Sequence, residues 1–162
     1  LKMAKFGISE TIYSEKVKTV RLAAGTNTAS AANTYGDEEV GKAVKLSADS
    51  RYVLCAAGDA IEGVITSMNL GRQDDYSIGG IVSTGYKNAV LDGLQATPGT
   101  GAVAIGDYVV VGTVVAKGTA LTAALKVTKA TDQAAAKAAP FKARVVAASG
   151  TAVGSTAVIE LF

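Results

Sequence analysis

The chain has 162 residues, a formal net charge of +2, and 16 lysines and arginines against 14 aspartates and glutamates. This length fits one domain or two small ones, and 49% hydrophobic residues supply enough apolar area for a core. The near balance of charge argues against a nucleic-acid-binding protein held by phosphate contacts, because such a protein needs a clustered basic surface.

Residues 1–40 are predicted to form an extended N-terminal arm. Val17–Leu22 alternates apolar and polar side chains and predicts a strand, whereas residues 23–37 contain no Val, Ile or Leu. Such a segment buries too little apolar area to offset its ordering entropy, so it is either a mobile loop or ordered by a partner surface. The arm's apolar side chains are the candidate partner-binding residues, because a strand of this kind can extend a neighbour's sheet. They are Ile8, Ile12, Tyr13, Val17, Val20 and Leu22.

Residues 41–162 are predicted to form a β-rich body. Short apolar or alternating runs predict strands at 44–46, 52–55, 61–65, 77–90, 108–115, 125–127, 142–147 and 157–162. The paired glycines Gly79 and Gly80 indicate a bulge or a sharp bend. Consecutive large apolar residues from Tyr108 predict a strand buried on both faces. The turn cluster at 97–101 is the candidate boundary between two hairpin subunits.

A single short helix is predicted at 131–139, with Thr131 or Asp132 as its N-cap and Pro140 after its end. The fold class is therefore all-β: a small β-barrel or sandwich with an extended N-terminal arm and at most one short helix.

The body contains a weak internal echo. Gly41–Val44 leads through Tyr52-Val53 to 60–64, and Gly106–Val109 leads through Lys126-Val127 to 142–146. A duplicated hairpin unit would explain this echo, but two copies of a loose pattern also arise by chance in a Val-rich chain. Chance is the explanation that we favour from the sequence.

Histidine and tryptophan are absent, and there is a single cysteine, Cys55. Histidine moves protons near neutral pH and is the commonest metal ligand, so its absence removes Ser-His and Cys-His pairs and most zinc or iron sites. We therefore expect no enzyme activity, no catalytic residue, no cofactor and no metal. Cys55 follows Val53 and Leu54 and is expected to be a buried apolar side chain.

Other local patterns also predict structural roles. The acidic clusters 37–39 and 74–75 lack the spacing of a calcium loop and are expected to be solvated loop charges. The glycine-rich segments lack the lysine of a phosphate loop. No stretch approaches the roughly 20 apolar residues of a membrane span, and the first residues lack a signal peptide's apolar run. We expect no membrane partner, and a protein that stays soluble or leaves the cell by lysis.

Three segments of the body, Gly41–Leu46, Ala57–Val64 and Ile105–Val110, resemble the small capsid decoration, or cement, proteins of tailed bacteriophages. The resemblance covers about half of the chain. It implies a structural virion protein that binds the outer surface of an icosahedral capsid between major coat subunits and stabilises the shell. It also implies the major capsid protein and a homotrimer as partners, and synthesis in the host cytoplasm. The chain departs from the family in the length of its arm.

Two other classes of function remain open. The first is a tail or fibre adaptor of a virion. The second is a non-catalytic carbohydrate-binding or accessory module, although aromatic residues are only 6% of the chain and sugar platforms need exposed aromatic rings. Copy number in the particle separates a decoration protein, present in many copies, from an adaptor, present in few.

Overall fold

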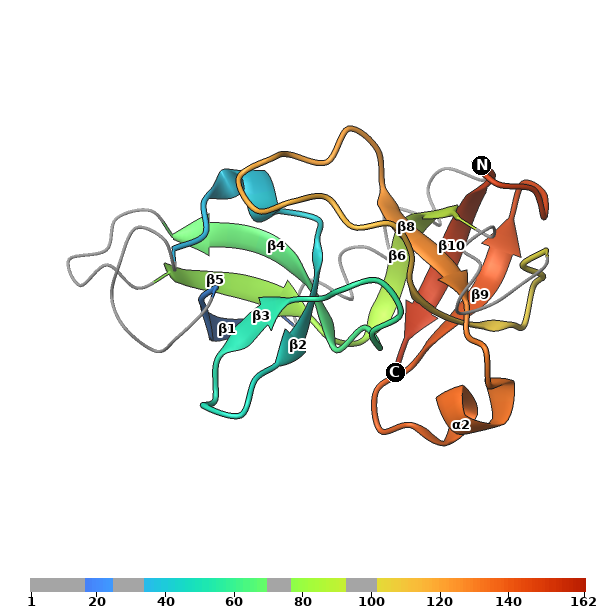
Figure 1. The fold of residues 1–162 in the computed structure, drawn as a ribbon, viewed down its shortest axis with the longest axis horizontal. Helices are drawn as coiled ribbons and strands as arrows, with labels where there is room; N and C mark the ends of the chain where they lie inside the picture. Colours follow the sequence, from blue (N-terminus) through green and yellow to red (C-terminus); the bar gives the residue numbers. More distant parts are fainter. Residues whose placement is uncertain (1–16, 25–33, 70–76, 93–101) are drawn as a thin grey trace, which may run out of the picture.

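The computed structural model describes residues 17–24, 34–69, 77–92 and 102–162. Ten strands form two closed five-stranded barrels that lie side by side (Figure 1). The first barrel contains β1 (Val17–Leu22), β2 (Ala43–Leu46), β3 (Tyr52–Leu54), β4 (Gly63–Asn69) and β5 (Ser77–Val82). The second contains β6 (Gly85–Leu91), β7 (Tyr108–Val111), β8 (Leu125–Lys129), β9 (Ala143–Ala148) and β10 (Thr156–Leu161).

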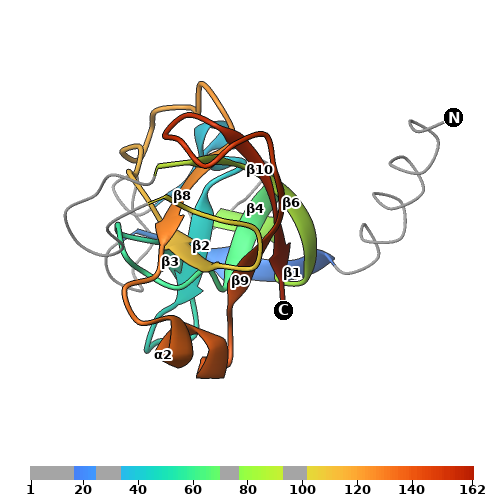
Figure 2. The ribbon, with the colours of Figure 1, turned by 90° about the vertical axis from the view of Figure 1, so that its right-hand side faces the viewer.

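The predicted fold class is confirmed: the described residues are nearly all β, in small barrels. The predicted short helix is also present as α2 (Gln133–Ala138), beside the second barrel in Figure 2. Its N-cap is Asp132, whose carboxylate accepts a hydrogen bond from the amide of Ala135 at 2.9 Å. Among the described residues, one 3-10 turn, η2 (Asp37–Glu39), precedes β2.

The two barrels have the same topology. The strands close in the order β1-β3-β2-β4-β5 in the first barrel and β6-β8-β7-β9-β10 in the second. Each barrel has one parallel pair, β1 with β3 and β6 with β8, and the remaining pairs are antiparallel. Each strand of the first barrel therefore has an equivalent strand in the second.

The strand registers also agree, down to one irregularity. Val64 and Ile65 of β4 pair with β5 in the same way that Arg144 and Val145 of β9 pair with β10. In both barrels the register shifts just after these residues. A bulge is a local feature that re-aims a strand, so its recurrence at an equivalent position argues against coincidence. The internal echo in the sequence therefore marks a structural duplication, and our preference for chance was wrong.

Each barrel has a core built from equivalent positions. Leu22, Val44, Ile65 and Ile81 are buried in the first barrel, together with Tyr35. Their equivalents Leu91, Val109, Val145 and Ile159 are buried in the second barrel. Because the β-strand period is two, these residues fix the faces that point inward and leave their neighbours pointing outward.

The domain boundaries differ from the prediction. Val17–Leu22 is a strand of the first barrel, paired along its whole length with β5, so the body begins before Gly41. The chain passes from one barrel to the other at Ser83 and Thr84, between β5 and β6, rather than near 97–101. Within the predicted arm, Ala23 and Tyr35 are buried against the first barrel. Residues 1–16 and 25–33 lie outside the described residues.

Two strand predictions need correction. The predicted strand 77–90 is two strands, β5 and β6, that belong to different barrels. Gly79 and Gly80 lie in β5 itself, and the register shift is in the partner β4. At Gly79 a Cβ would lie 2.5 Å from the carbonyl oxygen of Ser67, so glycine is needed for close approach of the two strands. The prediction that the strand from Tyr108 is buried on both faces is wrong. Half-buried and buried residues alternate along β7, because its outward face is not covered.

Candidate binding surface

The two barrels share an apolar interface. Ala43, Cys55, Ile61 and Val64 of the first barrel belong to the same buried cluster as the core of the second barrel. This contact explains why Cys55 is buried, as expected from its apolar neighbours. The burial of four side chains from one barrel against the other holds the pair together by the hydrophobic effect.

A turn of the first barrel extends this interface with backbone hydrogen bonds. The amide of Gly58 donates to the carbonyl of Val111 at 2.8 Å, and the amide of Val111 donates to the carbonyl of Asp59 at 3.0 Å. Gly58 has a φ of 87°, which glycine adopts without steric cost. The end of β7 is thereby paired on both sides, by β8 and by this turn of the first barrel.

A buried ion pair anchors the β7–β8 connection to the first barrel. Glu39 and Lys42 are 3.5 Å apart, and their side chains are 1% and 6% exposed. The Glu39 carboxylate also accepts hydrogen bonds from the amides of Gly36 (2.8 Å) and Gly118 (2.6 Å), while Lys42 donates to the carbonyl of Ala116 (2.9 Å). The prediction that cluster 37–39 is solvated is therefore wrong for Glu39. Residues 74–75 lie outside the described residues.

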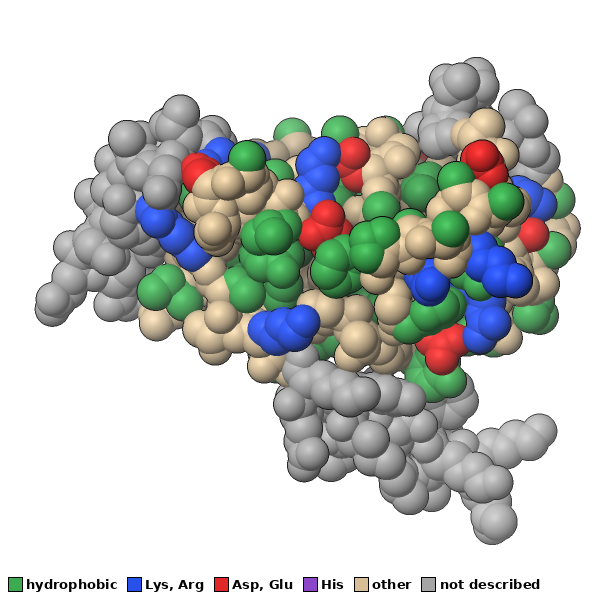
Figure 3. All heavy atoms as spheres, turned by 90° about the horizontal axis from the view of Figure 1, so that it is seen from below, with side chains coloured by type: hydrophobic (Ala, Val, Ile, Leu, Met, Phe, Trp, Pro, Cys, Tyr) green, Lys and Arg blue, Asp and Glu red, His purple; other side chains and the backbone are tan. Residues whose placement is uncertain are grey.

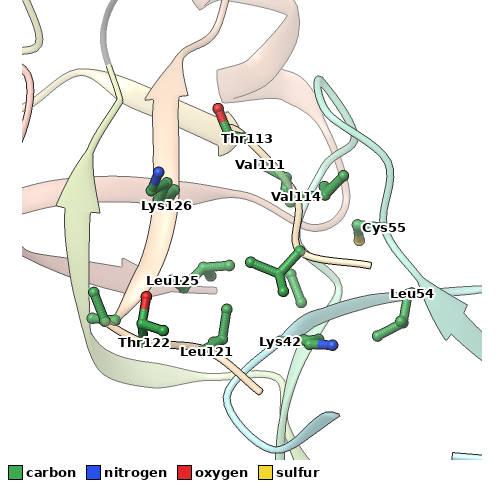
Figure 4. Close-up of a pocket in the computed structure, with 14 residues that line it drawn as sticks. Lys42, Leu54, Cys55, Val111, Thr113, Val114, Leu121, Thr122, Leu125 and Lys126 are labelled. Carbon is green, nitrogen blue, oxygen red and sulfur yellow. The ribbon is translucent and has the colours of Figure 1, made fainter. Parts of the chain in front are cut away.

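A small pocket of about 50 Å³ lies where the barrels meet (Figure 4). Lys42, Leu54 and Cys55 line it from the first barrel, and residues of β7, β8 and their connection line it from the second. Burial raises the pKa of Cys55 to about 12, so its thiol is not an activated nucleophile at neutral pH. This volume suits one or two water molecules rather than a sugar or a nucleotide.

A larger feature is found on the outward face of the second barrel. Tyr86, Glu160, Arg144 and Tyr108 are successive register partners across β6, β10, β9 and β7. Their neighbours Val109, Val145 and Ile159 point into the core, so these four side chains point outward. We call the four residues the second-barrel row. Seen from below, the second-barrel side of the molecule carries basic, acidic and hydrophobic side chains close together (Figure 3).

Charge and aromatic contacts organise this row. Arg144 donates to the Glu160 carboxylate at 2.7 Å, and this hydrogen bond raises the pKa of Arg144. The ring of Phe162 lies edge-on to that of Tyr108, with ring centroids 6.4 Å apart. The cationic groups of Lys142 and Arg144 lie 5.3 and 5.4 Å from the centroid of Phe162. Tyrosine and arginine side chains that hold each other in place are typical of protein-binding surfaces.

The equivalent row of the first barrel has a different composition and is largely buried. Ala43, Val64, Val82 and Val17 are register partners across β2, β4, β5 and β1. Ala43, Val64 and Val82 are 4%, 5% and 4% exposed, and the first two pack against the second barrel. In contrast, the side chains of Arg144 and Glu160, which take the places of Val64 and Val82, are 42% and 28% exposed. At the end of the two rows there is no such difference, because Val17 is 41% exposed and Tyr86 is 43% exposed. The face that the first barrel uses for docking is thus largely uncovered in the second.

The residues predicted to bind a partner are not brought together as one surface. Val17 is exposed, Val20 is half-buried, and Leu22 is fully buried in the first core. Leu22 therefore cannot contact a partner while the barrel is folded, because an inward-facing strand position packs the core. Ile8, Ile12 and Tyr13 lie outside the described residues. The strand that was predicted to extend a neighbour's sheet is paired with β5 of its own barrel.

The second-barrel row was missed from the sequence. Alternation predicts that Arg144 and Glu160 face solvent, because each stands between apolar residues in a strand. No signal in the sequence shows that Tyr86 and Tyr108 lie in line with them, because that depends on how distant strands pair.

Comparison with protein-family models, with curated proteins and with solved structures finds no match for this chain. Among the described residues, no helix is long and apolar enough to span a membrane, and no three Asp, Glu or Cys side chains are grouped to hold a metal ion.

Proposed function

We propose that this chain is a structural virion protein that binds the outer surface of an icosahedral capsid, between major coat subunits, and stabilises the shell. The mechanism is added interface. A contact of about 1,600 Å² repeated by symmetry over a particle supports tight binding without any chemistry. In this proposal the protein acts as a homotrimer and is found on the outer capsid surface.

The second-barrel row is the observation that carries this proposal. It places two tyrosines and an arginine in line on a closed barrel, where the strands hold them at fixed separations. Side chains already ordered by their neighbours lose little entropy on binding, which favours a protein partner. The resemblance of the body to phage decoration proteins indicates which kind of partner that is.

The carbohydrate-binding alternative is less well supported by the same surface. The rings of Tyr108 and Phe162 are inclined by 62°, and two cationic side chains approach Phe162. A sugar-stacking platform needs a flat, accessible ring face, which this arrangement does not favour. The tail or fibre adaptor remains the alternative that shares the row's chemistry.

Binding to particles tests the proposal. Fluorescently labelled full-length protein is added to particles of the encoding virus that lack it, and bound protein is measured after sedimentation. We expect saturable binding at many sites per particle and a higher temperature of genome release. Binding confined to a few sites would instead indicate an adaptor, and no binding would refute a virion role at the capsid surface.

A further inference from the structure

The duplication leaves two complementary surfaces unused within one chain. Within the chain, two residues of the first-barrel row, Ala43 and Val64, belong to the buried cluster that also contains Val111, at the end of β7. The second barrel's own row has no barrel docked on it in the described structure. The surface of the second barrel around Val111 has an equivalent in the first barrel, at the end of β2.

The residue equivalent to Val111 is Leu46. Both are the last residues of their strands and pair with the neighbouring strand of the hairpin, Leu46 with Tyr52 and Val111 with Val127. Val111 is 2% exposed because the first barrel covers it, whereas Leu46 is 51% exposed. The amide of Leu46 donates to the carboxylate of Glu62 at 2.9 Å, at the place where a turn of the other barrel pairs with Val111.

From these two surfaces we infer that the chain assembles head to tail with further copies of itself, the second-barrel row of one copy docking on the Leu46 end of the next. The Leu46 end comprises Leu46, the turn 47–51 and Glu62. A heterologous contact of this kind closes into a ring when the rotation between copies allows it. The inference rests on the self-association in the proposed function and identifies the surfaces that carry it.

Charge supports a second copy as the occupant. The second-barrel row with Lys142 carries two cations and one anion, so it has an excess of positive charge. The Leu46 end carries Asp49, Arg51 and Glu62, a net charge of −1, and the charge of the adjacent Lys45 is balanced by Asp59 at 2.6 Å. The exposed apolar side chain of Leu46 offers an apolar contact to the aromatic side chains of the row, while opposite charges at its border set the orientation.

A mixing experiment tests both surfaces at once. Arg144→Glu changes the row at the position equivalent to Val64, and Leu46→Arg changes the other end. The two side chains are 42% and 51% exposed, and circular dichroism and thermal melting check that the fold is intact. Val153→Glu and Val153→Arg are matched controls, because Val153 is 48% exposed and lies in the turn before β10, at the other end of that strand from Glu160. Sedimentation velocity of the full chain over a range of concentrations measures assembly.

We expect the unchanged chain and both controls to self-associate, and each surface variant to associate at least about tenfold more weakly. An equimolar mixture of the two variants should form a 1:1 dimer, because each supplies the surface that the other lacks. A monomeric unchanged chain, variants that assemble normally, or a mixture that stays monomeric would each overturn the inference. Particle binding is measured separately, so a chain that assembles but binds no particle would refute the capsid role alone.

Discussion

Glu39 offers the sharpest test of how the two barrels are joined. Its carboxylate accepts hydrogen bonds from the amides of Gly36 and Gly118 and pairs with Lys42, at 1% exposure. In Glu39→Gln the amide keeps one acceptor oxygen, but its NH₂ group faces a backbone donor, and Lys42 stays buried without its anion. Removal of one partner of a buried ion pair costs about 3–5 kcal/mol in the free energy of unfolding. For a chain of this size that corresponds to a fall in Tm of roughly 10 °C.

The matched control is Glu38→Gln, which makes the same chemical change at an exposed neighbouring position. Scanning calorimetry of Glu39→Gln, Lys42→Met and the double variant completes a double-mutant cycle. We expect the double variant to lose less stability than the two single variants together, by about 1 kcal/mol or more, because it leaves no unpaired buried charge. If Glu39→Gln melts within about 2 °C of Glu38→Gln, the pair does not anchor the β7–β8 connection and the reasoning fails.

Three further predictions concern other parts of the molecule. Burial raises the pKa of Cys55 to about 12 from an ordinary value of 9.0, so the unfolded thiol ionises first and stability falls as pH rises from about 9 toward 12. Urea unfolding at pH 8.5 and at pH 10.5 measures this effect. Between these two pH values, the free energy of unfolding should fall by about 2 kcal/mol more for the unchanged chain than for Cys55→Ala, and equal falls would contradict the burial argument. Gly79→Ala should lower stability by about 1–3 kcal/mol, because its Cβ meets the Ser67 carbonyl and the Leu22 side chain, and an unchanged urea midpoint would count against close strand contact. Under the proposed function, deletion of 1–16 removes the predicted partner-binding residues Ile8, Ile12 and Tyr13, so it should reduce particle occupancy at fixed concentration while both barrels stay folded. Full occupancy would show that this segment takes no part in attachment.

The truncation differs from the one that the sequence alone would recommend. Deletion of residues 1–40 would remove β1, including Leu22, and would also remove Glu39. The first barrel would then lose a strand, a core side chain and a buried ion pair. A loss of particle binding in that variant would therefore report unfolding rather than a lost contact.

Local patterns predicted most of the strands because alternation and β-branched residues act over a few positions. The strand at 17–22 and the helix capped by Asp132 both follow from such signals. The closing of ten strands into two rings does not follow from them. In both barrels a parallel pair brings together segments far apart in the chain, and no residue type marks that pairing.

The candidate surface depends on these long-range pairings. Tyr86 and Tyr108 are ordinary strand residues in the sequence, and they fall in line with Arg144 only through the registers of β6, β10, β9 and β7. The duplication was also hard to recognise in the sequence. Equivalent core positions are apolar in both barrels, but they do not always hold the same amino acid. Val44 corresponds to Val109 of the second barrel, whereas Ile65 corresponds to Val145. The hydrophobic core tolerates such exchanges while the backbone topology is kept.

The most direct test of the capsid role is the copy number of this chain in the native particle. Under the proposed function a virus encodes this chain, and quantitative mass spectrometry of its purified virions measures the ratio of this chain to the major capsid protein. The proposed function predicts a copy number of the same order as that of the coat subunit, because attachment sites repeat with the symmetry of the shell. A few copies per particle would contradict it in favour of a tail or fibre adaptor, and absence from the virion would contradict any structural role there.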